Sequence, residues 1–221
     1  MNVSSLNKDC CYRNLCLEKN ENCENNCILY QEMNFLLNNC GIDYSEDRVS
    51  FSLEENKLSK EFFDVRENIF HFVSTGGNMF ITSTERNNRK TRNSIRLMYR
   101  YFDAVAIGNS FQQRGYFIYV PEFVQRIRTF EYRETDEFKR IDGIIKNVDL
   151  IVWDDITGIK LNSTDQNNLY SYLGYRKNKR KANIYNGVFQ GDLSKILGEK
   201  IEEILMEESI VVELDNNIEE E

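Results

Sequence analysis

The stretch Asn147–Thr157, NVDLIVWDDIT, limits the possible folds of this chain more than any other. Its apolar residues, Val148 and Leu150–Val152, include β-branched side chains and lack regular polar alternation. This pattern is typical of a strand covered on both faces within a parallel sheet. Two adjacent carboxylates, Asp154 and Asp155, follow where that strand must end. The alternative to a functional pair is an Asp-rich turn.

Strand and helix patterns alternate on both sides of this stretch. The other predicted strands are 78–83, 116–120, 183–187 and 210–214, and the predicted helices are 28–37, 60–75, 92–103, 122–130, 136–146, 164–177 and 192–206. Such alternation implies right-handed crossovers and a parallel sheet with helices on both faces. The sequence therefore predicts an α/β fold.

The predicted strand 78–83 leads into a polar, basic loop, Thr84–Thr91, and then into a helix. A strand, a loop ending in Lys-Thr and a helix form the layout of a phosphate-binding P-loop. In P-loop NTPases, a carboxylate pair after a second strand lies at the Mg²⁺ ion and beside the attacking water. The predicted catalytic residues are Asp154 and Asp155, and the predicted ATP/Mg²⁺-binding residues are Asn88, Arg89, Lys90 and Thr91.

The acidity of the chain is concentrated at one end. The net charge is −8, but from Glu199 onward ten acidic residues accompany one Lys, whereas the preceding part carries 27 basic and 26 acidic residues. Such an end is usually solvated, and a regulatory role is the alternative. No apolar stretch approaches the roughly 20 residues that cross a bilayer, and the start, MNVSSLNKDC, lacks a signal-peptide core. We therefore expect a soluble cytoplasmic protein without a membrane partner.

All six cysteines lie within the first 40 residues. The segment 9–27 is polar and Asn-rich, with too little apolar content to bury a core. In a cytoplasmic protein such a cluster is more often a metal site than a disulfide framework, and Zn²⁺ held by four thiolates would supply the missing folding energy. The predicted zinc ligands are Cys11, Cys16, Cys23 and Cys27, with Cys10 as a replacement for Cys11, Cys40 as a spare ligand and free thiols as the alternative.

The length of 221 residues suits one ordinary domain with a small appendage. Residues 1–41 are predicted to form the Cys-rich module, and the polar, poorly patterned residues 42–57 are predicted to form a linker. Residues 58–221 then form the α/β domain with its acidic C-terminal end.

A basic run accompanies three tyrosines near the end of the predicted helix 164–177. The run is predicted to contact nucleic acid, because cations follow a phosphate backbone and aromatic rings stack on bases. The alternative is a solvated helix end, where cations also suit the helix dipole. Its residues are Arg176, Lys177, Lys179, Arg180 and Lys181.

Three segments, Tyr99–Phe130, Val148–Arg176 and Ala182–Gly187, resemble a known family. They are similar to the DnaC/DnaI-like replicative helicase loaders of phages and Firmicutes, which are AAA+ P-loop ATPases. The Cys cluster followed by CILYQEM also resembles the zinc-containing N-terminal region of these loaders. The resemblance implies an AAA+ sheet without a separate lid domain. It also implies an N-terminal module that binds the replicative DNA helicase, and a role in placing that helicase on single-stranded DNA.

The phosphate-binding loop departs from the family pattern. The family has glycines before Lys-Thr, whereas this chain has Asn87, Asn88 and Arg89. Glycines allow positive φ and a close approach of the backbone to phosphates. A left-handed conformation at Arg89 would cost roughly 1–2 kcal/mol.

Two further positions depart in the same direction. The family's sensor Asn, at the end of the fourth strand, aligns with Val188. The family's arginine finger aligns with Ile204 in LGEKIEEI. Three such losses together favour a pseudo-ATPase.

Three hypotheses follow from these patterns. The first is a loader-like protein of DNA replication that binds the helicase with ATP hydrolysis weak or lost, and that assists a functional loader or competes with it. The second is an active ATP-dependent loader with an adapted P-loop. The third treats the Cys module as a nucleic-acid-binding knuckle on a scaffold.

Overall fold

A computed structural model describes residues 27–42, 59–84, 89–189 and 191–214. Within these ranges five strands form one sheet, in the order β2-β3-β4-β1-β5, and every neighbouring pair is parallel. The strands are β1 (Asn78–Ser83), β2 (Gly115–Tyr119), β3 (Leu150–Asp154), β4 (Ala182–Val188) and β5 (Ile210–Glu213). The predicted parallel α/β sheet is therefore confirmed.

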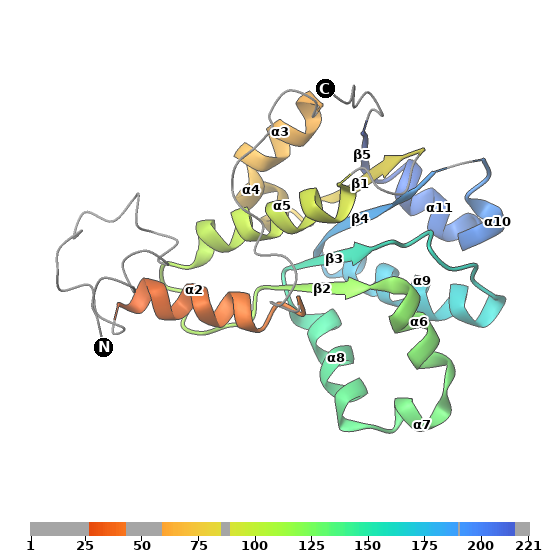
Figure 1. Cartoon of the computed structure of the whole chain (residues 1–221), viewed down its shortest axis with the longest axis horizontal. Helices are drawn as coiled ribbons and strands as arrows, with labels where there is room; N and C mark the ends of the chain where they lie inside the picture. Colours follow the sequence, from red (N-terminus) through yellow and green to blue (C-terminus); the bar gives the residue numbers. More distant parts are fainter. Residues whose placement is uncertain (1–26, 43–58, 85–88, 190, 215–221) are drawn as a thin grey trace, which may run out of the picture.

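Helices cover both faces of this sheet (Figure 1). One face packs against α2 (Ile28–Asn38), α3 (Lys60–Glu67), α4 (Ile69–Ser74) and α5 (Lys90–Val105). The other face packs against α6 (Val120–Arg128), α8 (Asp136–Asn147), α9 (Ser163–Asn178), α10 (Ser194–Leu197) and α11 (Glu199–Met206), with the short α7 (Phe130–Arg133) joining α6 to α8.

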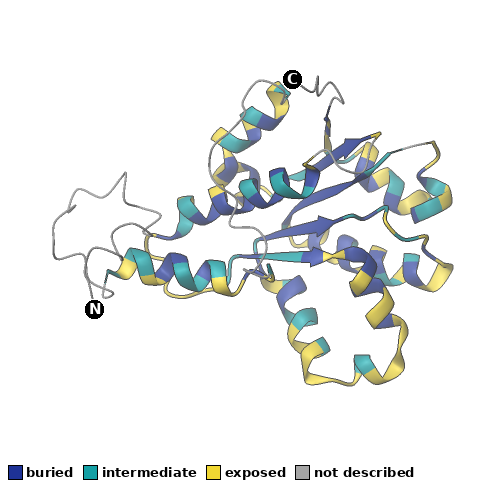
Figure 2. Ribbon diagram, in the orientation of Figure 1, coloured by how far each residue is buried: buried dark blue, intermediate teal, exposed yellow. Residues whose placement is uncertain are grey.

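Strand β3 lies in the interior of the molecule, and all five of its residues are buried (Figure 2). Leu150 and Val152 belong to the core beneath α5, whereas Ile151 and Trp153 belong to the core beneath α9. Because both faces of β3 are covered, apolar side chains are favoured at every position. This explains why the strand lacks polar alternation.

Two predicted helices are each divided into a pair. The first break is at Asn68, whose side-chain amide donates to the Asp64 carbonyl at 3.0 Å and ends α3. The second is at Gly198, which has φ of 88° between α10 and α11. A Cβ atom at Gly198 would overlap the Gln166 side chain, so this break requires glycine.

The segment after β2 also differs from the prediction. Strand β2 ends at Tyr119, and Pro121 lies in the first turn of α6, where its missing N–H has no cost. The helix α7 follows and was not predicted. Together α6, α7 and α8 extend away from the sheet, below β2 in the view of Figure 1.

Helix α2 packs directly on the α/β body. Met33, Leu36 and Cys40 belong to the same buried cluster as α5 and β1. The Glu32 carboxylate is buried and accepts the backbone N–H groups of Asn109 at 2.8 Å and Ser110 at 3.0 Å. The end of the predicted 1–41 module is thus part of this core, while most of the predicted module and linker lies outside the described residues.

Candidate functional site

Polar side chains from four elements meet where β1, β3 and β4 end. They are Ser83, Lys90, Thr91, Asp154 and Asn186, here called the carboxyl-edge cluster. The carboxyl ends of parallel strands share one edge, and the crossover from β1 begins α5 at that edge. Ligands of open α/β sheets bind in such a position. The topology therefore brings together Lys90, Thr91 and Asp154, as the sequence predicted.

Lys90 is the first residue of α5 and is 6% exposed. Its ammonium group donates to the Ser83 hydroxyl at 2.7 Å, which connects the end of β1 to the start of the helix. Burial lowers the pKa of Lys90, and the nearby Asp155 and Asp154 carboxylates oppose that shift. The buried cation is therefore held close to two acidic groups.

Asp154 ends β3 and is buried. Its Oδ1 atom accepts the Thr91 hydroxyl at 2.7 Å and the Asn186 amide at 2.6 Å. Burial raises the pKa of Asp154, while these two hydrogen bonds oppose the shift. Within the described residues, no hydrogen-bond donor reaches its Oδ2 atom. A carboxylate oxygen and an adjacent Thr hydroxyl are the protein ligands that Mg²⁺ uses in P-loop NTPases, so these residues fit that ion.

Asn186, which was not predicted as a site residue, lies in the cluster. Its amide donates to Asp154 and to the Ser94 hydroxyl at 3.0 Å, and its oxygen accepts the Asp155 backbone N–H at 2.9 Å. Val188 lies two residues later, and its N–H donates to the Thr157 hydroxyl. The alignment of the family's sensor position with Val188 stays a prediction.

Asp155 follows the strand in a left-handed conformation, with φ of 51°. Its backbone is fixed by Asn186, and its carbonyl accepts the Gly158 N–H at 2.8 Å. The Asp155 carboxylate lies so close to Gly158 that a Cβ atom there would overlap it. The two adjacent carboxylates thus differ, because Asp154 lies in the cluster and Asp155 is half-buried in the turn beyond it.

Arg89 has φ of 66° and forms the N-cap of α5. The position therefore adopts the left-handed conformation for which the related P-loops use glycine, at a cost of roughly 1–2 kcal/mol for a residue with a side chain. Asn88 lies outside the described residues.

Ile204, the position aligned with the arginine finger, lies on α11 and is 5% exposed within the core beneath α9. A side chain at this position packs inward, away from any neighbouring molecule. The aligned residue is thus a core residue of this chain.

The basic run is divided between structural and exposed residues, so the predicted nucleic-acid surface must be corrected. Arg176 is fully buried, and its guanidinium donates to four backbone carbonyls and to the Asn183 side-chain oxygen. Lys181 donates to Asp149 at 2.9 Å, and Lys177 pairs with Glu208 at 2.6 Å. Lys179 and Arg180 are exposed, and they form no ion pair with another described residue.

The cysteines that the structure describes are Cys27 and Cys40. Cys27 is half-buried at the start of α2. Cys40 is fully buried and donates to the Leu37 carbonyl, and burial raises its pKa to about 11, so it is unsuited as a spare metal ligand. No group of three potential metal ligands occurs in the described ranges, and Cys10, Cys11, Cys16 and Cys23 lie outside them.

No family model matches this sequence, and no curated protein matches it. Solved structures do match the fold. The crystal structure of the DnaC helicase loader aligns with a TM-score of 0.55 and 15% identity, over 71% of this chain and 100% of that chain. The crystal structure of DnaI aligns with a TM-score of 0.53 and 16% identity, over 74% of this chain and 90% of that chain.

The replication initiator DnaA, in a structure bound to AMPPCP and single-stranded DNA, aligns with a TM-score of 0.54 and 16% identity. The alignment covers 72% of this chain but 46% of that one, so this chain spans about half of DnaA. These likenesses confirm the predicted parallel α/β fold, which is similar to that of the DnaC and DnaI loaders. No helix in the ranges described here is long and apolar enough to cross a membrane.

Proposed function

We propose that this chain is a loader-like AAA+ protein of DNA replication whose carboxyl-edge cluster binds Mg·ATP, with hydrolysis weak or lost. The observation that carries this proposal is the contact of Thr91 and Asn186 with one oxygen of Asp154, beside the buried Lys90. These residue types come from β1–α5, β3 and β4, as in a P-loop nucleotide site.

Each residue of the cluster has a distinct role in this proposal. Lys90 would contact the β- and γ-phosphates, and Thr91 and Asp154 would hold Mg²⁺, which would supply neutralisation of the phosphate charge. Asn186 keeps Asp154 and the Asp155 backbone in fixed positions through its two side-chain contacts. Asp155 lies next along the chain, where it would orient a water molecule.

Weak hydrolysis is supported by two positions. Ile204 is buried, so the aligned residue supplies no arginine finger, a group typically worth about 10³–10⁵ in rate. Arg89 takes the place of a glycine, and its side chain crowds the space that a phosphate needs next to the backbone.

The partners in this proposal are the replicative DNA helicase and single-stranded DNA, with competition or cooperation with a functional loader. Two of the matched structures support it, because one is a helicase loader and another is a replication initiator bound to single-stranded DNA. Of the basic run, Lys179 and Arg180 remain as candidate contacts for a nucleic acid.

The zinc module is a separate part of the proposal. Four thiolates, Cys11, Cys16, Cys23 and Cys27, would hold Zn²⁺ just before α2, whose attachment to the body through Glu32 fixes the position of Cys27. Metal analysis of protein purified without chelator tests it. About one equivalent of zinc, lost in Cys27→Ser, is expected, and metal-free folded protein would contradict it.

Calorimetric titration of the full chain with Mg·ATP and Mg·ADP tests nucleotide binding. Lys90→Ala is expected to weaken binding at least about tenfold, or 1.4 kcal/mol. The control, Arg92→Ala, changes a neighbouring half-buried cation outside the cluster and is expected to leave affinity unchanged. Folded wild-type protein that releases no heat with either nucleotide would rule the proposal out.

A second candidate function, an active ATP-dependent loader, is favoured by Asn186. This side chain contacts both Asp154 and the Asp155 backbone, so a polar residue holds both predicted catalytic residues. Turnover measured with helicase and single strands present decides between the two. Wild-type turnover that is abolished in Asp155→Asn would establish an active loader. Wild-type turnover no higher than that of Asp155→Asn would support the binding protein instead.

A further inference from the structure

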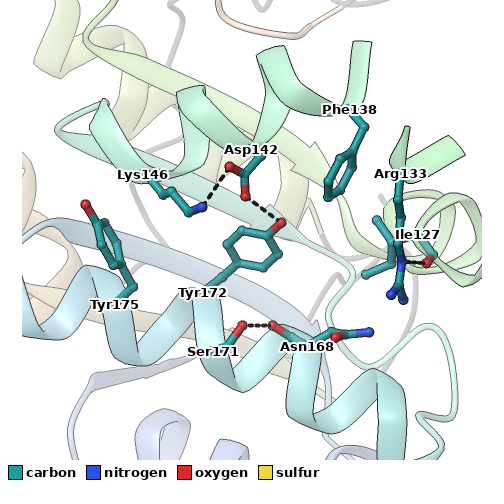
Figure 3. Close-up of a pocket in the computed structure, with 9 residues that line it drawn as sticks. All are labelled: Ile127, Arg133, Phe138, Asp142, Lys146, Asn168, Ser171, Tyr172 and Tyr175. Carbon is teal, nitrogen blue, oxygen red and sulfur yellow. Dashed lines mark hydrogen bonds and ion pairs between the residues drawn. The ribbon is translucent and has the colours of Figure 1, made fainter. Parts of the chain in front are cut away.

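A pocket separate from the carboxyl-edge cluster lies on the opposite face of the sheet from α5 (Figure 3). It lies between α8 and α9, and α6 and α7 close one end of it. Its volume is about 230 Å³. None of its lining residues belongs to the carboxyl-edge cluster. The residues that form its walls are Ile127, Arg133, Phe138, Asp142, Lys146, Asn168, Ser171, Tyr172 and Tyr175.

On one wall of this pocket, the polar side chains already form hydrogen bonds with one another. Asp142 accepts the Lys146 ammonium at 2.7 Å and the Tyr172 hydroxyl at 3.0 Å, one on each carboxylate oxygen. The negative charge of Asp142 is thus neutralised within the protein. A ligand entering here meets no unpaired carboxylate on this wall.

The other wall presents hydrogen-bond donors that lack acceptors. Arg133 donates from Nε to the Ile127 carbonyl at 2.6 Å, which fixes its guanidinium, and its terminal nitrogens reach no acceptor in the described part of the chain. The Asn168 Nδ2 atom is buried and also has no partner there. Figure 3 shows the Asn168 amide and the Arg133 guanidinium directed toward the same gap. An unsatisfied buried donor typically costs about 1–3 kcal/mol, and an oxyanion in this gap would satisfy both groups.

The remaining surface of the pocket is aromatic. Phe138 and Tyr172 contribute rings, and Tyr175 is 37% exposed at the opening. A planar group stacks favourably on such rings. The adjoining α7–α8 segment exposes Glu131, Glu134 and Asp136, which repel a polyanion but have less effect on a single charge. The pocket therefore suits a small anion better than a nucleic-acid strand.

We propose that this pocket binds a small organic anion in which one phosphate or carboxylate group is attached to a planar ring. The oxyanion accepts hydrogen bonds from Arg133 and Asn168. The ring lies against the aromatic walls. This site is independent of nucleotide binding at the carboxyl-edge cluster.

Amide ¹⁵N–¹H spectra of the full chain, titrated with phenyl phosphate, benzoate and inorganic phosphate, test the proposal. Phenyl phosphate or benzoate is expected to shift the signals of Asn168 and Tyr172, and the stronger of the two identifies the oxyanion. Inorganic phosphate is expected to bind more weakly because it has no ring. The same shifts in Lys90→Ala separate this pocket from the carboxyl-edge cluster.

Two variants and one control sharpen the test. Arg133→Gln is expected to weaken binding about ten- to hundredfold, and Asn168→Leu about three- to tenfold. Arg140→Gln, a change of an exposed arginine on α8 outside this pocket, is expected to have no effect. Asn168→Leu is also expected to leave the unfolding midpoint without ligand unchanged or higher, because it removes an unsatisfied donor.

Three results would overturn the proposal. One is the absence of ring-dependent shifts at Asn168 and Tyr172 in folded wild-type protein. Another is a marked loss of stability in Asn168→Leu, which would make Asn168 a structural residue. The third is tighter binding of a single-stranded oligothymidylate that Arg133→Gln abolishes, which would assign the pocket to nucleic acid.

Discussion

The two edges of the sheet each carry a cluster of charged and amide side chains, but only one has unused hydrogen-bonding capacity. At the amino edge, where the strands begin, the Arg176 guanidinium uses its five N–H donors in five hydrogen bonds. The side-chain oxygen of Asn183 accepts hydrogen bonds from both Arg176 and Trp153. At the carboxyl edge, the Asp154 Oδ2 atom accepts no described donor. The first cluster is a structural network, and the second retains the capacity to bind a ligand.

The comparison shows that basic residues of this chain have two different roles. Arg176 and Lys181 look like a nucleic-acid surface in the sequence, yet they bind carbonyls and Asp149 within the protein. Lys90 is also buried, but it stands at a helix N-terminus beside two carboxylates. The position of a cation in the fold, more than its charge, distinguishes the two roles.

Removal of the amino-edge cation is expected to give the largest effect. Arg176→Met removes the guanidinium hydrogen bonds to four backbone carbonyls and to Asn183, and we expect the free energy of unfolding to fall by at least about 3 kcal/mol. Urea denaturation measures the loss. Lys179→Met, at an exposed position three residues later, serves as the control. A loss below about 1 kcal/mol in Arg176→Met would remove the structural role.

Removal of the Asp154 charge at the carboxyl edge is expected to weaken ligand binding but not to destabilise the fold. Asp154→Asn should lower Mg·ATP affinity on the order of a hundredfold, or about 2.7 kcal/mol. Because burial raises the pKa of Asp154 in the folded state, its charged form opposes folding above that pKa. The variant should therefore be more stable than wild type at pH 7 without nucleotide, as measured by thermal unfolding. Lower stability with unchanged affinity would contradict a ligand-binding role.

The same shift predicts a pH dependence of Mg²⁺ binding. A raised Asp154 pKa means that the carboxylate must lose its proton before it binds the cation, so Mg²⁺-dependent affinity for ATP should rise as pH increases through that pKa. Titrations in buffers of increasing pH, with Asp154→Asn as the control, measure it. An equally steep rise in the variant would assign the dependence to another group.

A smaller effect is expected at Glu32, whose carboxylate accepts hydrogen bonds from within the protein. Glu32→Gln keeps the side-chain length but replaces a charged acceptor of two backbone N–H groups with a neutral one. We expect a loss of about 1–2 kcal/mol in unfolding free energy. Hydrogen exchange at Asn109 and Ser110 locates the effect. Unchanged protection of both amides would show that α2 is held by its apolar contacts alone.

The smallest effect is expected at Lys179. Lys179→Ala should change stability by no more than about 0.5 kcal/mol, as for most exposed positions. The same variant tests the proposed nucleic-acid contact: if Lys179 contacts a phosphate, the slope of log affinity for single strands against log salt should decrease in magnitude by about 1. An unchanged slope would remove Lys179 from the candidate contacts.

Much of the fold could be predicted because local patterns and global topology agree. The buried run before Asp154 indicated a central strand, and the spacing of Lys90 and Thr91 after β1 indicated a phosphate site at the same edge. Asn186 could not be identified as a member of the cluster from the sequence, because Asn186 and Val188 lie on the same face of β4 and only the packing decides which side chain reaches Asp154.

The burial of individual residues in the basic run could not be predicted from the sequence, for a different reason. Arg176 lies one residue from exposed Lys177, and only the packing of α9 against the start of β4 decides which of them points inward. Similarly, the contact of Gly198 with the Gln166 side chain joins positions 32 residues apart in the chain. Long-range contacts of this kind leave no local pattern.

Hydrogen exchange of the full chain with and without saturating Mg·ATP tests the central comparison most directly. The account predicts slower exchange in the first turn of α5 and at Asp155 and Ile156, with no change at residues 176–183. Equal exchange throughout, or protection at 176–183 in place of the carboxyl edge, would contradict it.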